Sequence, residues 1–209
     1  VNRNTIPGDQ SALNPSGLRL GTTWISQRGF KAAEVDELTN LISELLQSTK
    51  PYSYPKRHGI NTYRAKVGFQ TLNEIKVKVR NLSHSMGIDY TPDNYRYPHF
   101  YYIDQEPPKA EYVTLEIMGD QAAQFLQTIS SNDVTSLSVG QSQNTEIRQK
   151  TNSVICALKR TDEVIFQLCI PASESVQIKT WLRDLSDGYI QLGSDDLHAK
   201  APGPVSIVD

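Results

Sequence analysis

Apolar residues recur at helical spacing in two segments of the first half of the chain. Residues 31–47 (KAAEVDELTNLISELLQ) carry one apolar face with acidic residues opposite, and a similar face recurs over 68–82. Spacings of three and four residues place side chains on one side of an α-helix, so both segments are predicted to be amphipathic helices. Residues 49–66, between them, contain Pro51 and Pro55 and are predicted to be a loop.

From residue 110 onward, the two-residue period of strands alternates with helical spacing. One helix is predicted over 122–129 with Asp120 as its cap, and another begins after Pro171 and ends at Gly188. The predicted strands lie near 113–117, 142–148, 153–159, 163–170 and 189–192, with a turn at Thr161-Asp162. This order is typical of a ferredoxin-like, or split βαβ, layout, so the predicted class is α+β.

Residues 87–109 separate the two halves. Prolines alternate there with tyrosines at a density that no helix tolerates: Tyr90, Pro92, Tyr95, Tyr97, Pro98, Tyr101, Tyr102, Pro107 and Pro108. The predicted organisation is therefore a first domain over 1–86, a Tyr/Pro-rich linker over 87–109 and a second domain over 110–209. The tyrosines are interpreted as covering the domain junction rather than as stacking on a ligand.

The composition narrows the classes of function. The 209 residues carry a formal net charge of -2, which argues against a broad nucleic-acid-binding face. No run approaches the roughly 20 apolar residues that span a bilayer. The two cysteines indicate no disulfide framework, so we expect a cytoplasmic protein. The histidines lack metal-ligand spacing, so we expect no metal site. Because the chain begins with Val1, we expect it to be a fragment of a longer protein.

Three short motifs occur in order near the start of the chain. Residues 2–9 read NRNTIPGD, residues 16–22 read SGLRLGT, and residues 28–30 read RGF before the first predicted helix. This series resembles the C-terminal part of serine hydroxymethyltransferase, with the patterns N-K-N-x-x-P-x-D, S-G-x-R-x-G-T and R-G-F. The resemblance covers roughly residues 1–85 and implies the small-domain tail of a fold-type I pyridoxal-phosphate enzyme.

The resemblance implies a role for four residues. Arg19 matches the arginine that binds the substrate carboxylate in that family, and a guanidinium can meet a carboxylate with two parallel hydrogen bonds. Asn4 matches the asparagine that contacts folate, and its amide offers both a donor and an acceptor to a heterocycle. Gly17 and Gly21 flank Arg19 as a supporting loop that lets the backbone approach a ligand. A surface ion pair and a turn residue are the alternatives for Arg19 and Asn4.

The pyridoxal phosphate site of that family lies in segments that this chain does not show. The aldimine lysine, the phosphate-binding loop and the aspartate beside the pyridinium nitrogen all precede the matched motifs in the family. The resemblance therefore implies no catalytic residue in this fragment, with the cofactor bound mainly upstream of Val1 and tetrahydrofolate acting as co-substrate.

The second half resembles the start of the glycine-cleavage T-protein, an aminomethyltransferase. The matching segments are GDQAAQFLQ at 119–127, SNDV at 131–134 and LSVGQ at 137–141. The family's acidic pair falls on Cys156-Ala157, which cannot act as a carboxylate, and a buried thiol is the favoured interpretation of Cys156. Asn132-Asp133 is interpreted first as a turn. We therefore expect a non-catalytic, T-protein-like domain.

Taken together, these patterns predict the C-terminal fragment of a glycine/serine hydroxymethyltransferase with an appended aminomethyltransferase-like domain. Whether the chain belongs to an enzyme is left open: the parent is expected to be one, and the fragment alone is not. The alternative is a non-catalytic folate-binding or scaffolding module tied to glycine-cleavage proteins. Expected partners are glycine or serine and folate, without nucleic acid or membrane, and the parent is expected to be a homodimer.

Overall fold

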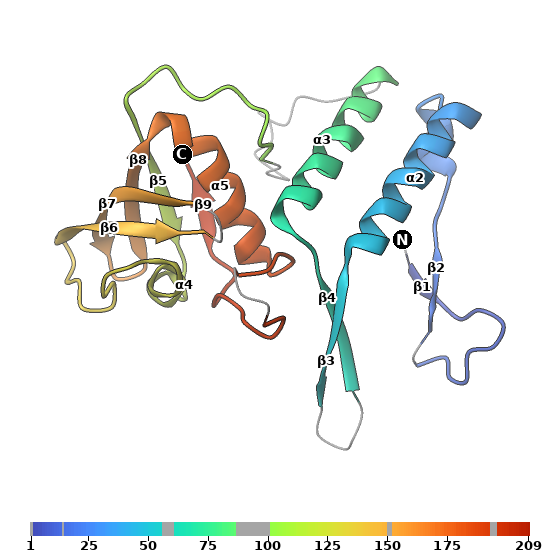
Figure 1. Cartoon of the computed structure of the whole chain (residues 1–209), viewed down its shortest axis with the longest axis horizontal. Coiled ribbons are helices and arrows are strands. Elements are labelled where there is room, and N and C mark those ends of the chain that lie inside the picture. Colours follow the sequence, from blue (N-terminus) through green and yellow to red (C-terminus); the bar gives the residue numbers. More distant parts are fainter. Residues whose placement is uncertain (1, 14, 56–60, 87–100, 150–151, 193–195) are drawn as a thin grey trace.

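The computed structural model describes residues 2–13, 15–55, 61–86, 101–149, 152–192 and 196–209. The first elements are short. Strand β1 (Asn2–Asn4) pairs antiparallel with β2 (Gly17–Arg19), and the five-residue helix α1 (Thr23–Gln27) follows. None of the residues of α1 is buried. The N-terminal ribbon formed by β1 and β2 therefore has little core of its own. It lies at one end of the molecule (Figure 1).

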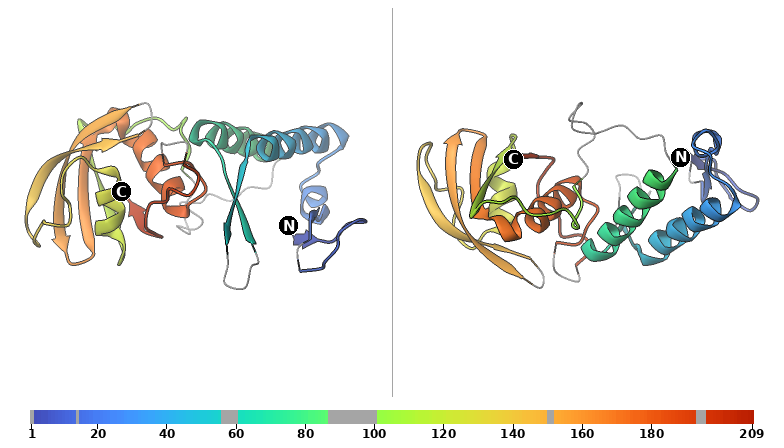
Figure 2. Two further views of the ribbon diagram at one scale, coloured as in Figure 1. Left: turned by 60° about the horizontal axis from the view of Figure 1, so that its bottom comes forward. Right: turned by 90° about the horizontal axis from the view of Figure 1, so that it is seen from above.

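Two long helices follow and lie side by side (Figure 2). Helix α2 (Ala32–Ser48) and helix α3 (Phe69–Ser85) confirm the predicted helices over 31–47 and 68–82. Glu34 accepts a hydrogen bond from the backbone N–H of Lys31 at 2.8 Å, which satisfies one of the amides at the start of α2. Ile75 and Leu82 are buried on α3, as the spacing predicts.

The segment between these helices is a hairpin, so the predicted loop over 49–66 is wrong. Strand β3 (Lys50–Pro55) pairs antiparallel with β4 (Asn61–Lys66), in a register that sets Pro51 opposite Ala65. A two-stranded ribbon has two edges, and proline is tolerated where its missing N–H would point away from the partner strand. The tyrosines and threonine around the prolines favour strand geometry, and this preference outweighs the two prolines.

The second half is built on one antiparallel sheet of five strands, which confirms the mixed α+β class. The order across the sheet is β6-β7-β8-β5-β9, with β8 in the centre. Helices α4 (Ala122–Ile129) and α5 (Ala172–Asp187) lie between the strands in sequence. The strands are β5 (Tyr112–Met118), β6 (Ser142–Arg148), β7 (Ser153–Asp162), β8 (Ile165–Pro171) and β9 (Ser206–Val208).

Three details of the predicted second half are wrong. Residues 189–192 form no strand of the sheet: Ile190 makes an isolated parallel bridge to Val67, and β9 supplies the last strand instead. Gln121 occupies the N-cap of α4 without a side-chain hydrogen bond, so Asp120 does not cap that helix. The turn of the β7–β8 hairpin lies one or two residues beyond Thr161-Asp162, because β7 continues through Asp162 beyond a bulge.

The core of the sheet continues into the first half of the chain. Val67 belongs to the buried cluster of the sheet domain, and Leu45, Phe69 and Leu72 pack against that cluster. A polar contact lies beside it, where Asp184 of α5 accepts hydrogen bonds from Asn73 at 2.8 Å and Lys76 at 3.2 Å, both on α3. Helix α3 is therefore attached to α5 by apolar and ionic contacts together.

Part of the predicted linker, residues 87–100, lies outside the described residues. The remainder is fixed to both halves. Arg80 of α3 binds the carboxylate of Asp104 through two hydrogen bonds of 2.9 and 2.6 Å and stacks 4.6 Å from the Tyr102 ring centre. The Tyr101 hydroxyl donates to the carbonyl of Ile207 in β9 at 2.9 Å. Tyr102 therefore contacts α3 and Tyr101 contacts β9, while the division into domains over 1–86 and 110–209 and the junction between them stay predictions.

Among the described helices, none has the length and apolar character that crossing a membrane requires.

Candidate functional site

The N-terminal ribbon brings Asn4 and Arg19 to one face. Asn4 pairs with Gly17, and Arg19 pairs with Asn2. Directly opposed residues of an antiparallel pair share a face, and so do residues two apart along a strand. Asn2, Asn4, Gly17 and Arg19 therefore share one face, while Arg3 and Leu18 occupy the other. Asn4 and Arg19 are diagonal neighbours, which typically lie about 7–8 Å apart.

Gly17 allows the chain to fold closely upon itself. A Cβ atom at this position would overlap the Cγ2 atom of Ile6 and lie 2.8 Å from the carbonyl oxygen of Asn4. Real Cβ atoms essentially never approach other atoms so closely, so any larger residue would displace Ile6 or the strand. Gly17 therefore permits Ile6 and the Asn4 carbonyl group of the same chain to approach its backbone closely. An added Cβ at Gly21 would meet no atom within 4 Å.

Asp9 holds the turn that joins the two strands, a role that the motifs do not assign to it. Its carboxylate accepts hydrogen bonds from the backbone N–H groups of Ile6 at 2.9 Å and Ser16 at 3.1 Å, and from the Ser16 hydroxyl. The bonds from the Ser16 side chain and from these two amides lower the pKa of Asp9. The signal was present in the sequence, because an aspartate after Pro7-Gly8 commonly bonds to its own turn.

The chemistry of this face suits a small anionic or heterocyclic ligand. One guanidinium and two amides lie together and remain exposed, and they can bind a carboxylate and the polar edge of a ring. Pyridoxal phosphate requires instead a lysine amine, a phosphate-binding loop and walls around the ring. The exposed ribbon face does not fit that cofactor by itself, so no chemical step through it is assigned to these residues.

Cys156 is a buried thiol, as predicted. It is 5% exposed, and its Sγ lies 3.4 Å from the carbonyl oxygen of Thr145. Burial raises the pKa of the Cys156 thiol to about 11, which keeps it protonated at neutral pH. Ala157 lies on the opposite face of β7 and is exposed. These two positions therefore provide neither a carboxylate nor a thiolate.

The T-protein-like motif residues hold a loop in place. Asp133 accepts hydrogen bonds from the backbone N–H groups of Thr135 at 2.9 Å and Ser136 at 3.2 Å, which confirms the turn predicted at Asn132-Asp133. Gln127 accepts from the N–H of Val134 at 2.7 Å. The hydrogen bonds of these side chains therefore fix the path of the chain between α4 and β6.

A cluster of titratable side chains lies where the β3–β4 hairpin meets residues 196–201. The rings of Tyr52 and Tyr54 both pack edge-on against His198, with centroids 5.2 and 4.9 Å away. Lys66 is buried and donates to the carbonyl of Ala199. Burial lowers the pKa of Lys66, and the charge of Lys200 adds to this effect while Asp196 opposes it. The short basic stretch at 56–58, by contrast, lies outside the described residues.

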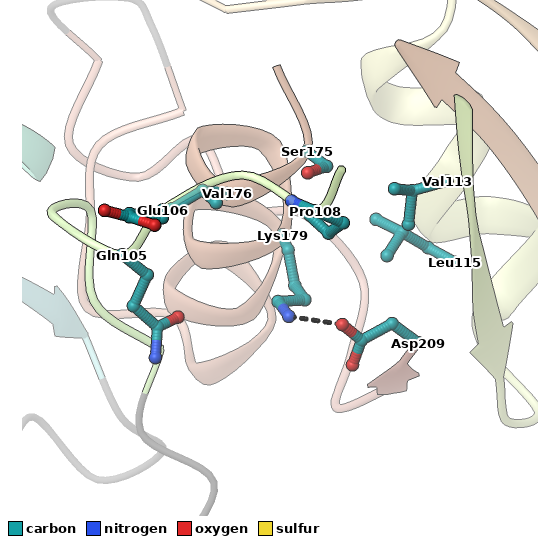
Figure 3. A pocket seen from close by; sticks show the side chains of 9 residues that line it. All are labelled: Gln105, Glu106, Pro108, Val113, Leu115, Ser175, Val176, Lys179 and Asp209. Carbon is teal, nitrogen blue, oxygen red and sulfur yellow. Dashed lines mark hydrogen bonds and ion pairs between the residues drawn. The ribbon is translucent and has the colours of Figure 1, made fainter. Parts of the chain in front are cut away.

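A cavity of about 350 Å³ opens beside α5, between the 105–108 segment and β5 (Figure 3). Val113, Leu115 and Val176 form its apolar side. Lys179 also lines the cavity. Its ammonium group pairs with Asp209 at 2.6 Å and lies 4.5 Å from the Tyr101 ring centre. Since these opposite charges neutralise each other, the cavity indicates no particular ligand.

Within the described part of the chain, no three histidine, cysteine, aspartate or glutamate side chains gather as metal ligands would. The candidate site is therefore the exposed face of the N-terminal ribbon, where Asn4 and Arg19 lie together.

Comparison with known proteins identifies the family to which this ribbon is related. Residues 1–42 match the family model for serine hydroxymethyltransferase. The matched residues contain β1, β2, α1 and most of α2, and thus the whole candidate face.

Individual relatives give the same result over short stretches. The chain is 52% identical over 46 residues to serine hydroxymethyltransferase of Bombyx mori, covering 22% of this chain and 10% of that protein. It is 35% identical over 85 residues to the cytosolic enzyme of Neurospora crassa, covering 37% and 18%. The chain thus spans between a tenth and a fifth of the length of these two relatives.

Solved structures also match part of the chain, among them an aminomethyltransferase. The crystal structure of glycine cleavage system aminomethyltransferase T from Bartonella henselae matches with a TM-score of 0.33 and 22% sequence identity. The match covers 34% of this chain and 20% of that structure.

Proposed function

We propose that this chain is the C-terminal part of a glycine/serine hydroxymethyltransferase, which interconverts serine and tetrahydrofolate with glycine and methylene-tetrahydrofolate. The observation that carries the proposal is the shared face of Asn4 and Arg19 within the family-matched residues. Arg19 binds the carboxylate of the amino acid, and Asn4 binds the pterin of folate. Gly17 and Asp9 support them by fixing the turn that sets this face.

Pyridoxal phosphate is assigned to parts of the protein outside this chain. When bound, it supplies the electron sink for the reaction. The residues of the ribbon orient the two substrates. A guanidinium fixed by strand pairing binds a carboxylate in one orientation, and this limits the directions from which the amino acid reaches the cofactor. The parent protein is proposed to be a homodimer, as the family resemblance implies.

We further propose that residues 110–209 are a T-protein-like domain that does not catalyse aminomethyl transfer. The path β5-α4-β7-β8-α5-β9, with β6 added at the edge, follows the split βαβ layout. A protonated, buried Cys156 and the adjacent Ala157 stand where the T-protein pattern has acids. The polar motif residues of the domain are engaged in hydrogen bonds that fix the loop over 130–141.

A second function, a non-catalytic folate-binding or scaffolding module tied to glycine-cleavage proteins, is favoured by one observation. The candidate face is exposed, and no described wall of this chain encloses a ligand against it. An open face of this kind can hold one end of a folate without conducting the reaction.

Substitutions on the two faces of the ribbon test these proposals in the full-length protein that contains this chain. Arg19→Ala is expected to raise the KM for serine by about 10- to 100-fold, because a charge-assisted hydrogen bond contributes about 1.5–3 kcal/mol. Asn4→Ala is expected to raise the KM for folate by about 3- to 10-fold, as a neutral hydrogen bond contributes less. Arg3→Ala, on the opposite face, is the matched control and should change neither constant.

The results separate the two functions. Unchanged constants for Arg19→Ala would refute the carboxylate role. Folate binding that is weakened by Asn4→Ala, in a full-length protein without hydroxymethyltransferase turnover, would support the non-catalytic module instead. Aminomethyltransferase turnover by the full-length protein would refute the non-catalytic assignment of residues 110–209.

A further inference from the structure

The five-stranded sheet has one covered face and one open face. Leu115, Leu158 and Leu168 are fully buried on the side that packs against α4 and α5. Their neighbours along each strand point to the other side. Figures 1 and 2 show the sheet at one end of the molecule, with α5 on its inner side and no described helix against its outer side.

The open face carries three rows of side chains that cross the central strands. The strand register places Ala157, Cys169 and Thr114 side by side in one row. The next row contains Lys159, Gln167 and Glu116. The third row, called the apolar row below, lies on the other side of the first row. It contains Tyr112, its partner Pro171 and, in line with them on β7, Ile155. Each row has its middle residue on β8.

The apolar row is unusually exposed. Ile155 is 76% exposed and Tyr112 is 56% exposed, and both are large apolar side chains on a strand. Exposed apolar residues grouped on one flat surface commonly mark an interaction site. The row of Lys159, Gln167 and Glu116 has charges of opposite sign at its two ends, which restricts the kind of surface that can cover it.

We propose that a second copy of this chain packs on the open face, related by a twofold axis that runs along β8 between the two sheets. The order β6-β7-β8-β5-β9 is balanced about β8, so this rotation sets β7 of each copy over β5 of the other. A twofold interface uses one surface twice and must be complementary to itself. The three rows meet that requirement.

The rotation places each row of one copy over the same row of the other copy, with the two rows running in opposite directions. Lys159 faces Glu116 of the second copy, and the contact occurs twice by symmetry. Ile155 faces Tyr112 in the same way, which covers the exposed apolar row. The carboxylate of Glu116 also accepts a hydrogen bond from Gln167 at 3.2 Å, which keeps it on this face. Sheets that stack in this way align to within about 30°.

The size of the face sets the expected strength of the dimer. With strands about 4.8 Å apart and residues rising about 3.4 Å each, the three central strands offer a patch about 14 Å by 24 Å. That is below the roughly 800 Å² per partner of a stable interface, so the dimer is expected to be transient, with a Kd in the micromolar range or above.

Charge reversal tests the proposal directly. In sedimentation of the 209-residue chain, the mass is expected to rise with concentration from 23.4 kDa toward twice that value. Lys159→Glu and Glu116→Lys should each raise the dimer Kd at least about 10-fold, because like charges then face each other. The double variant Lys159→Glu/Glu116→Lys should restore the dimer, and so should a mixture of the two single variants.

A chemical crosslink tests the position of the axis. Cys169 lies in the middle row on β8, so the two copies present it to each other across the interface. A short bismaleimide is expected to link two chains through Cys169 at concentrations where the dimer forms. Cys169→Ser should abolish the link. Cys156→Ser should retain it, because Cys156 is buried beneath the sheet.

Three results would overturn the proposal: a chain that stays monomeric at every concentration reached, a dimer that the charge reversals do not weaken, or a dimer that Cys169 does not link. Each of these outcomes leaves the hydroxymethyltransferase proposal intact, because the ribbon face contributes no residue to this surface.

Discussion

Single residues on the N-terminal ribbon set the shape of the candidate face. Gly17 is opposite Asn4, and its missing side chain leaves room for Ile6. Asp9 then ties Ile6 to Ser16 across the turn. Neither residue is placed to contact a ligand itself. Both act through Asn4 and Arg19, since a shift of the turn would move the two strands that carry those side chains.

Replacement of Gly17 by alanine is expected to loosen the ribbon. The added methyl group overlaps Ile6 and the Asn4 carbonyl, and overpacking of this kind typically costs about 1–3 kcal/mol. Amide hydrogen exchange at 2–4 and 17–19 should become faster, while exchange in the distant sheet stays unchanged. Gly21→Ala is the matched control, because an added Cβ there meets no atom within 4 Å. Equal exchange in both variants would contradict this account of Gly17.

At the scale of elements, helix α3 is held to α5 by a buried polar contact within apolar surroundings. The carboxylate of Asp184, whose side chain is 9% exposed, binds both Lys76 and Asn73. Asn73 is itself fully buried and donates a second bond to the carbonyl of Phe69 at 3.0 Å. Removal of the carboxylate would therefore leave the largely buried Lys76 ammonium without its partner and remove one of the two hydrogen bonds of the Asn73 amide.

The variant Asp184→Ala is expected to lower the free energy of unfolding by about 3 kcal/mol, because breaking a buried ion pair leaves an uncompensated charge. Asp187→Ala is the matched control on the same helix. Its pair with Arg183, at 3.6 Å, is more exposed, and its loss should cost about 0.5 kcal/mol or less. Urea denaturation of both variants measures the difference, and similar losses for the two aspartates would contradict the role assigned to Asp184.

Across the whole molecule, burial is very uneven. The fully buried large side chains lie in the sheet domain, among them Phe125 and Phe166, whereas α1 has no buried residue. Trp24 and Leu13 of the N-terminal region are 79% and 88% exposed. Because burial of apolar area is the main source of stability, the two ends of the molecule are expected to differ in their resistance to opening.

Native-state hydrogen exchange should reveal this gradient. Amides of β5 and β8 are expected to exchange only on global unfolding, and those of β1, β2 and α1 by local opening at least about 100-fold faster, a difference of about 2.7 kcal/mol. The amides of α3 should lie close to those of the sheet, since Phe69 and Leu72 pack against its core. Fast exchange throughout α3 would contradict a shared core.

The elements with strong periodicity could be predicted from the amino-acid sequence. The two long helices of the first half, α5 with its glycine end and the strands β5 to β8 follow from spacing, because one buried face imposes a regular pattern on each. The motif around Arg19 likewise indicated the family that the comparison found. A buried Cys156 followed from the apolar strand that contains it.

The remaining features depend on contacts between segments that are distant in the sequence. The β3–β4 hairpin forms despite its prolines, because pairing with a specific partner strand adds to the strand preference of the tyrosines. Ile190 joins Val67 rather than the sheet, while 206–208 takes the edge beside β5. The common face of Asn4 and Arg19, and the balanced rows on the open sheet, depend on register between distant segments. Register is a property of two paired segments, so the periodicity of either segment alone does not predict it.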